Sequence, residues 1–120
     1  MDLFLVIDQD RSAMHALGLA CLERNVGVAM AETLCEGVRV LLSRTASLIV
    51  VDVGLLRLSP PEHATLFERV APGVPVVVVA HPDTPLETRV AFELQGFHVR
   101  TRPLAVEDLV EKGTAGALRA

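Results

Sequence analysis

The stretch ASLIVVDVGLL, residues 46–56, is a run of aliphatic residues interrupted by one carboxylate, Asp52. A solid apolar run of this length is typical of a strand that is buried on both faces. Burying a carboxylate is strongly unfavourable unless the group is paired, hydrogen-bonded or placed at the edge of the apolar region. We therefore expect Asp52 at the end of a core strand, where the chain leaves the interior.

Apolar segments alternate along the chain with segments in which apolar residues recur at helical spacing. The expected strands are residues 3–7, 26–30, 47–53, 74–80 and 97–101, and the expected helices are residues 12–24, 34–44, 60–70, 85–95 and a last helix after Pro103. Five rounds of strand then helix predict a parallel sheet with helices on both faces. The first, third and fourth strands are the most apolar, which predicts the strand order 2-1-3-4-5 of a flavodoxin-like, doubly wound α/β fold.

Three helix starts carry the pattern of a capping box, in which a hydroxyl at the N-cap precedes a glutamate by three residues. The pairs are Thr33 with Glu36, Ser59 with Glu62, and Thr84 with Glu87. Proline follows Ser59 and Thr84 directly, at a position where its missing N–H costs nothing. The three pairs predict where the second, third and fourth helices begin.

Composition narrows the class of protein. The chain has 120 residues, which predicts a single domain over 1–120, and its net charge of -4 with no Tyr or Trp argues against a nucleic-acid surface. Cys21 and Cys35 lack the spacing of a metal site, so we expect reduced thiols and a cytoplasmic protein. The short apolar stretch after Met1-Asp2 is not expected to be a signal peptide, and no apolar run is long enough to cross a membrane.

Asp8 ends the first expected strand, as Asp52 ends the third. In the predicted strand order the crossover direction reverses between these two strands, and a crevice opens at their carboxyl ends. We expect both carboxylates to meet in that crevice as a functional pair. The alternative for each is a helix N-cap or a loop acid.

Four segments resemble the receiver domain of two-component response regulators, and the resemblance covers nearly the whole chain. They are FLVIDQD (4–10), LIVVDV (48–53), VPVVVVA (74–80) and AFELQGFHVRTRP (91–103). The resemblance implies that Asp52 occupies the position of the aspartate that accepts a phosphoryl group from a histidine kinase. It also implies a Mg²⁺ ion held by Asp8, Asp52 and the backbone carbonyl of Gly54, and Arg102 in the position of a phosphate-binding lysine.

Several positions depart from the family pattern. Gln9 follows Asp8 where the family has a second acid, so we expect weak Mg²⁺ binding; Gln9 or Asp10 could serve as a ligand, although Asp10 is at least as suited to an N-cap. The Ser/Thr that reads the phosphoryl group is Ala80, followed by His81, which we expect in a flexible loop.

Two further departures concern the fifth strand. The family lysine is Arg102, which keeps the positive charge in a different shape, and the only lysine of the chain, Lys112, lies in the last helix. Val99 stands where the family commonly has an aromatic switch residue.

We therefore expect a receiver-like signalling module whose phospho-switching is weakened or lost, a pseudo-receiver rather than an enzyme. The first alternative is a fully phosphorylatable, Mg²⁺-dependent receiver. A remote alternative is a small haloacid-dehalogenase-type phosphohydrolase that uses Asp8 and Asp10. Expected partners are a histidine kinase or another signalling protein, without direct nucleic-acid or membrane binding. A homodimer through helix four, strand five and helix five is also expected, with Phe92 either exposed on that face or buried.

Overall fold

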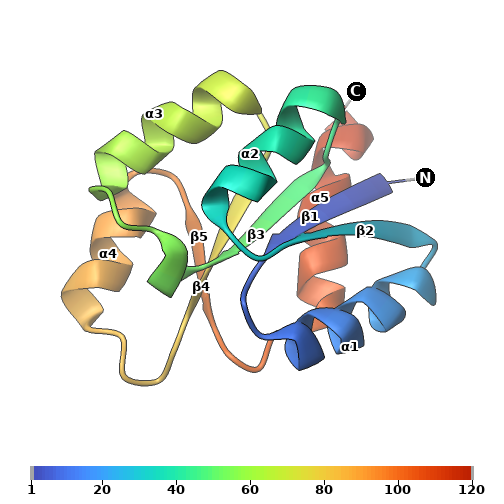
Figure 1. Cartoon of the computed structure of the whole chain (residues 1–120), viewed down its shortest axis with the longest axis horizontal. Coiled ribbons are helices and arrows are strands. Elements are labelled where there is room, and N and C mark those ends of the chain that lie inside the picture. Colours follow the sequence, from blue (N-terminus) through green and yellow to red (C-terminus); the bar gives the residue numbers. More distant parts are fainter. Residues whose placement is uncertain (1, 120) are drawn as a thin grey trace.

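The computed structural model describes the backbone of residues 2–119 and the side chains of residues 2–114. Five parallel strands form one sheet in the order β2-β1-β3-β4-β5, which confirms the predicted topology (Figure 1). The strands are β1 (Asp2–Ile7), β2 (Val26–Ala31), β3 (Leu48–Asp52), β4 (Val76–Ala80) and β5 (His98–Thr101).

The helices form a layer on each face of this sheet. One layer holds α1 (Arg11–Leu22) and α5 (Val106–Arg119), and the other holds α2 (Leu34–Ser43), α3 (Pro60–Val70) and α4 (Leu86–Leu94). A 3-10 turn, η1 (Val53–Leu55), follows β3. Figure 1 shows α2 and α3 in front of the sheet and α5 behind it. None of the helices in the part of the chain that the structure describes is long and apolar enough to span a membrane.

The core divides between the two faces because side chains alternate along a strand. Buried residues of β1, β3 and β4 that pack toward α2, α3 and α4 are Leu5, Ile7, Ile49, Val51, Val76 and Val78. Their alternating neighbours, which pack toward α1 and α5, are Phe4, Val6, Leu48, Val50, Val77 and Val79. The three central strands are therefore buried on both faces, as their uninterrupted apolar sequences predict.

The predicted capping boxes have three different outcomes. At Ser59 the box is complete, since the Ser59 hydroxyl accepts the Glu62 amide and the Glu62 carboxylate accepts the Ser59 amide. Thr33 caps α2, but the Glu36 carboxylate accepts the amide of Glu32 instead of Thr33. The prediction at Thr84 is wrong, because α4 has Pro85 at its N-cap and no side-chain cap there.

The faces of α4 are reversed relative to the spacing pattern. Phe92 is buried, 4% exposed, and its ring packs edge-on against Phe97 at 5.5 Å between centroids. Leu86, Val90 and Leu94 recur at the spacing of one helix face, a pattern that predicts a stripe facing the core, but they face outward. A large aromatic ring removes more apolar area from water than any one of these aliphatic side chains, so the helix turns that ring inward.

A histidine of α3 is buried where α3 packs against α4. His63 is fully buried between the rings of Phe67 and Phe92, and its Nε2 accepts the amide of Leu58 at 2.9 Å. Its Nδ1 is buried and has no partner within residues 2–114. Burial lowers the pKa of His63, and the nearby charge of Glu62 opposes this only in part.

This lowered pKa predicts a loss of stability on mild acidification. An unfolded histidine takes up a proton near pH 6.5, whereas folded His63 takes it up only at lower pH, so the free energy of unfolding falls as pH decreases below about 6.5. Chemical denaturation at pH 7.5 and 5.5 measures the difference. His63→Gln, which keeps an acceptor for the Leu58 amide, is expected to have a smaller difference. The remainder comes from His98, whose pKa is also lowered. An unchanged difference in His63→Gln would contradict this prediction.

Candidate functional site

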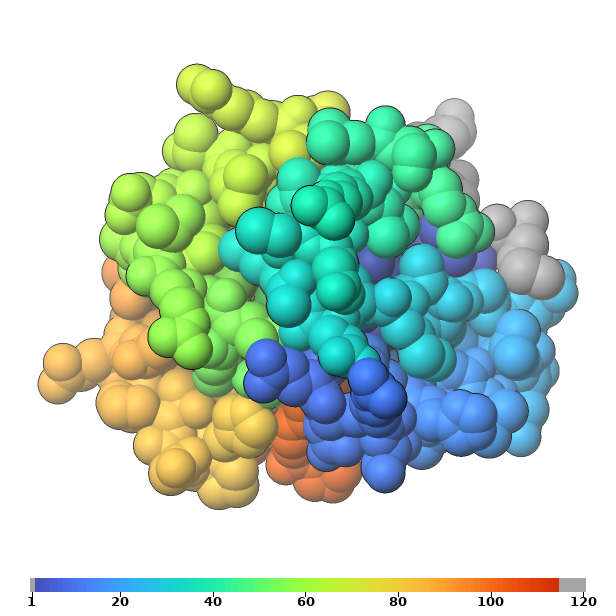
Figure 2. Space-filling view, viewed as in Figure 1, coloured from blue at the N-terminus to red at the C-terminus, as the bar shows by residue number. Residues whose placement is uncertain are grey.

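The carboxyl ends of the strands bring together side chains from four separate segments. Ile7 pairs with Val51 in the sheet, so Asp8 and Asp52, one residue further along each strand, are neighbours at its edge. The segments after β1, β4 and β5 meet along the lower edge of the molecule in Figure 2, in blue, yellow-orange and deep orange. This edge is the crevice that the strand order predicts.

The Asp52 carboxylate is held by three groups. Its Oδ2 accepts the amide of Gly54 at 2.9 Å, which fixes the start of η1. Its Oδ1 lies 2.6 Å from Nε2 of His81 and 3.3 Å from Nη2 of Arg102. The Asp52 side chain is 13% exposed. A carboxylate at the rim of an apolar strand is thus supplied with a hydrogen bond and a charged partner, which offsets the cost of its burial.

Arg102 joins the two carboxylates of the site. Its Nη2 donates to Asp8 Oδ2 as well as to Asp52 Oδ1, and its side chain is 23% exposed. Burial acts to lower the pKa of Arg102, but hydrogen bonds and charges from Asp8 and Asp52 outweigh it, so that the pKa is raised. Its Nε is buried without a partner within the residues whose side chains the structure describes.

The carboxylates of Asp8 and Asp10 accept hydrogen bonds from backbone amides of the following residues. Asp8 Oδ1 accepts the amide of Asp10 at 3.0 Å, and the Asp10 carboxylate accepts the amide of Ala13 at 3.1 Å as the N-cap of α1. Gln9 is exposed. The sequence left Asp10 between a ligand and an N-cap, and the structure places it at the N-cap.

His81 departs from the prediction of a flexible loop residue. The loop after β4 is fixed by Arg89 of α4, which donates to the carbonyls of His81 at 2.8 Å and Thr84 at 3.2 Å and to the hydroxyl of Thr101 at 2.5 Å. The Thr84 hydroxyl also accepts the His81 amide at 2.9 Å. Sequence reasoning missed this arrangement, because Arg89 stands in a helix and carries no motif. The signal available in the sequence was the position of Arg89, one helical turn after Pro85.

The remaining predicted residues lie where their strands place them. Ala80 ends β4, fully buried, and brings no polar group to the site. Val99 is half-buried in β5 and packs on the core beneath α2, α3 and α4. Lys112 pairs with Asp108 within α5 at 2.5 Å and not with the acids of the crevice.

The cluster places two carboxylates beside a guanidinium and an imidazole. The Asp52 carboxylate lies at the rim of the core, the Arg102 guanidinium is a group suited to phosphate oxygens, and the His81 imidazole can donate or accept. Among the described residues no group of three or more His, Cys, Asp or Glu side chains is arranged to hold a metal. A divalent ion here would have two carboxylates, Asp8 and Asp52, and both already contact Arg102.

Comparison with curated proteins gives one kind of relative. The transcriptional regulatory protein GlrR of Escherichia coli (strain K12) is 29% identical over 117 residues, which is 90% of this chain and 26% of GlrR. The chain therefore spans about a quarter of the length of that relative. No protein-family model matches the sequence.

Solved structures show the same fold. A two-component response regulator from Clostridium difficile has a TM-score of 0.81 at 19% identity, covering 99% of this chain and 98% of that one. The beryllofluoride-activated NtrC4 receiver domain dimer also has a TM-score of 0.81, at 20% identity, with 99% and 98% covered. A response regulator from Burkholderia pseudomallei with a phosphorylated aspartic acid, calcium ion and citrate has a TM-score of 0.79 at 20% identity, with 99% and 71% covered. The chain has the CheY-like, flavodoxin-like fold of receiver domains.

Loss of Arg102 is expected to destabilise the fold. Arg102→Met leaves two partly buried carboxylates side by side without the guanidinium that joins them, which is expected to lower the free energy of unfolding by about 1–3 kcal/mol. Arg100→Met is the matched control, since Arg100 pairs with Asp108 at the exposed surface and its loss is expected to cost less than about 0.5 kcal/mol. Urea denaturation of the two variants measures both effects, and equal losses would show that Arg102 has no special role.

Proposed function

We propose that this chain is a receiver-type module of two-component signalling, with Asp52 in the phosphoacceptor position and with phospho-switching weakened or lost. The observation that carries the proposal is the convergence of Asp8, Asp52 and Arg102 at the switch-point edge, beside a fully buried Ala80 that has no hydroxyl to offer. Asp8, Asp52 and Arg102 would form a site for a phosphoryl group, whereas Ala80 lacks the hydroxyl that would respond to that group.

The acceptor chemistry is a transfer between a phosphohistidine and a carboxylate. An Asp52 oxygen would form a bond to phosphorus as the bond from phosphorus to the donor nitrogen breaks. Arg102 would then neutralise phosphoryl oxygens, a task to which its planar fork is suited. Because the same Nη2 of Arg102 contacts both Asp8 and Asp52, Asp8 would hold the guanidinium beside the oxygens of Asp52. The expected partner is a histidine kinase or another signalling protein, in the cytoplasm, where free Cys21 and Cys35 stay reduced.

Magnesium fits this donor set only weakly. Mg²⁺ is commonly held by one or two carboxylates together with water and phosphate oxygens, and Asp8, Asp52 and the Gly54 carbonyl could supply the protein ligands. When bound, such an ion would supply positive charge to the phosphoryl oxygens. Asp10 is committed to the Ala13 amide, and Gln9 is neutral, so no second acid strengthens the site. Arg102 would have to share both carboxylates with the metal.

The residues that would respond to a phosphoryl group are less complete than those that would bind it. A ligand shifts a conformational equilibrium only through contacts that differ between the two states. Ala80 can form no hydrogen bond to a phosphoryl oxygen, and Val99 has no ring to move. The β4–α4 loop is already tied to β5 by Arg89 through Thr101, which favours a single arrangement of this region.

Phosphorylation can be tested directly. With Mg²⁺ and acetyl phosphate, we expect a phosphoryl adduct on a minor fraction of chains by intact mass, and none in Asp52→Asn. Beryllofluoride is expected to shift backbone amide resonances near Asp52 but not those of α4 and β5. Gln9→Asp, which returns a second acid, is expected to increase the adduct. Ala80→Ser, which returns a hydroxyl, is expected to extend the amide shifts into α4.

Two results would contradict the proposal. A complete adduct on the unmodified chain, with amide shifts throughout α4 and β5, would identify a fully phosphorylatable receiver. An adduct that persists in Asp52→Asn would place the acceptor elsewhere.

The phosphohydrolase alternative has no support in the site, because the Asp10 carboxylate that would act as its general acid is the N-cap of α1.

A homodimer through α4, β5 and α5 is a further part of the proposal. Leu86, Val90 and Leu94 form an outward apolar stripe on α4, with Leu86 73% and Leu94 79% exposed. The similar NtrC4 receiver domain is a dimer when activated by beryllofluoride. An exposed row of large apolar side chains is the kind of surface that a second copy could cover. Phe92 is buried, so it would not itself contact a second copy.

Self-association is expected to depend on this stripe. Leu94→Glu is expected to lower the average mass in solution by light scattering at high protein concentration. Leu42→Glu, at an equally exposed leucine on α2, is the control and is expected to leave the mass unchanged. A monomeric unmodified chain, or equal effects of the two substitutions, would count against this surface.

A further inference from the structure

Each of the four carboxylate oxygens of Asp8 and Asp52 already has a protein partner within hydrogen-bond distance. Asp8 Oδ1 and Asp52 Oδ2 each accept the backbone amide two residues further along the chain, at 3.0 and 2.9 Å. Asp8 Oδ2 accepts a hydrogen bond from Nη2 of Arg102. Asp52 Oδ1 lies 2.6 Å from Nε2 of His81 and 3.3 Å from the same Nη2. A cation that entered this acid pair would therefore have to displace groups that the fold supplies.

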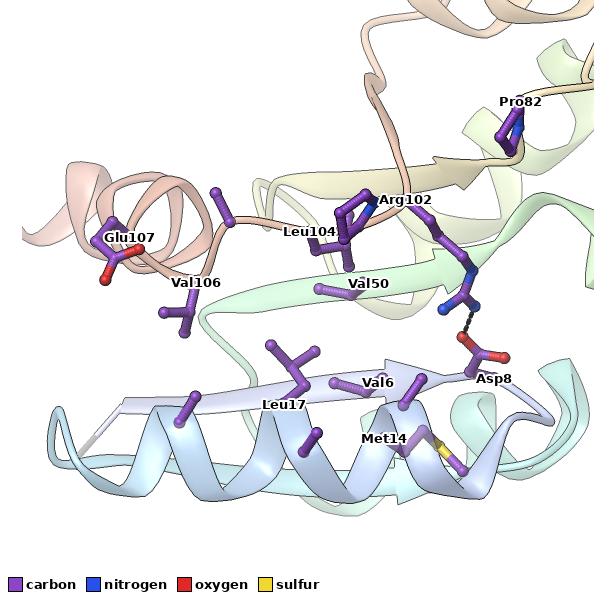
Figure 3. A pocket seen from close by; sticks show the side chains of 15 residues that line it. Val6, Asp8, Met14, Leu17, Val50, Pro82, Arg102, Leu104, Val106 and Glu107 are labelled. Atoms are coloured by element: carbon purple, nitrogen blue, oxygen red, sulfur yellow. Dashed lines mark hydrogen bonds and ion pairs between the residues drawn. The ribbon is translucent and has the colours of Figure 1, made fainter.

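One atom, Nη2 of Arg102, contacts both carboxylates. Figure 3 shows the Arg102 side chain extending from the segment after β5 to Asp8, directly after β1. The second contact of this nitrogen is with Asp52, at the end of β3. A cation shared by the two carboxylates would have to take the place of this nitrogen. The guanidinium stays charged throughout the physiological pH range, so the acid pair already contains one permanent positive charge.

The fold keeps this positive charge in place. The backbone amide of Arg102 donates to the carbonyl of Ala80, at the end of β4, at 3.2 Å, and the Arg102 side chain is only 23% exposed. Among the residues whose side chains the structure describes, Arg102 is the only Lys or Arg that pairs with Asp8 or Asp52. A divalent ion at the pair would meet the repulsion of this guanidinium or would have to drive it out.

We propose that Arg102 is the resident cation of the acid pair: it takes the place of a divalent ion between Asp8 and Asp52, so that the site binds Mg²⁺ poorly and accepts a phosphoryl group without it. The part that concerns phosphoryl transfer rests on the proposed function, whereas the part that concerns the cation rests on the contacts of Arg102 alone. In transfer from acetyl phosphate, an Asp52 oxygen forms a bond to phosphorus as the bond from phosphorus to the acetate oxygen breaks. Acetate leaves, and Arg102 supplies the positive charge that faces the phosphoryl oxygens.

Magnesium binding tests the cation directly, without a phosphoryl donor. Mg²⁺ is titrated into the unmodified chain, Arg102→Met and Arg100→Met, and the amide resonances of residues 8–10 and 52–54 are followed. Arg102→Met removes the competing charge and is expected to bind Mg²⁺ about tenfold more tightly than the unmodified chain. Arg100→Met loses an arginine that pairs with Asp108 instead, and is expected to bind Mg²⁺ like the unmodified chain.

Stability gives a second readout of the same competition. An ion that binds only the folded protein raises the free energy of unfolding by mass action. Added Mg²⁺ is therefore expected to raise the urea midpoint of Arg102→Met and to leave the midpoints of the unmodified chain and Arg100→Met unchanged. If Arg102→Met does not fold, Arg102→Gln, which keeps a neutral hydrogen-bond donor, replaces it in both measurements.

Phosphorylation of the unmodified chain tests the second part of the inference. The Asp52 adduct from acetyl phosphate is expected to reach the same fraction with EDTA as with Mg²⁺. An adduct that forms only with Mg²⁺, or an unmodified chain that binds Mg²⁺ as tightly as Arg102→Met, would overturn the inference. The absence of any adduct under both conditions would contradict the proposed function instead, and the Mg²⁺ titration would still decide whether Arg102 is the resident cation.

Discussion

Strands β1, β3 and β4 are buried on both faces of the sheet, and this burial determines where the polar side chains of the site can lie. Such strands hold few polar side chains along their length, so polar groups collect where β1, β3 and β4 end. Asp8 and Asp52 meet there, and their mutual repulsion is relieved by one guanidinium from the segment after β5. The ion pairs of Arg102 thus connect the first, third and fifth strands of the sheet, and the same contacts that permit burial also define the site.

The parts of the fold that rest on uninterrupted patterns followed from the sequence. The solid apolar runs predicted which strands are central, and the alternation of strands and helices predicted the strand order. The placement of Asp8 and Asp52 followed from that order, because the carboxyl ends of parallel strands share one edge. Arg102 was expected beside them only from the family resemblance. Position along a strand is therefore a strong guide to which distant residues meet.

Other features depended on contacts that no local pattern contains. The sequence pattern predicts the Thr84 hydroxyl as a cap for α4, but this hydroxyl accepts the His81 amide, so Pro85 is the N-cap of the helix without a side-chain hydrogen bond. Periodicity alone could not choose between the two faces of α4, since the packing of Phe92 against Phe97 decides it. The local sequence predicts a flexible His81, because the side chain that fixes its loop, Arg89, comes from a later helix.

The alternation of side chains in β1 and β3 has a consequence for how such a protein diversifies. Val6 and Val50 face α1 and α5, whereas Ile7 and Val51, one residue further along, face α2, α3 and α4. Changes on one face leave the packing of the other face almost untouched, because a sheet separates them. Selection can therefore alter the side chains on one side of the sheet and those on the other through separate sets of mutations, while the strand ends between them stay the same.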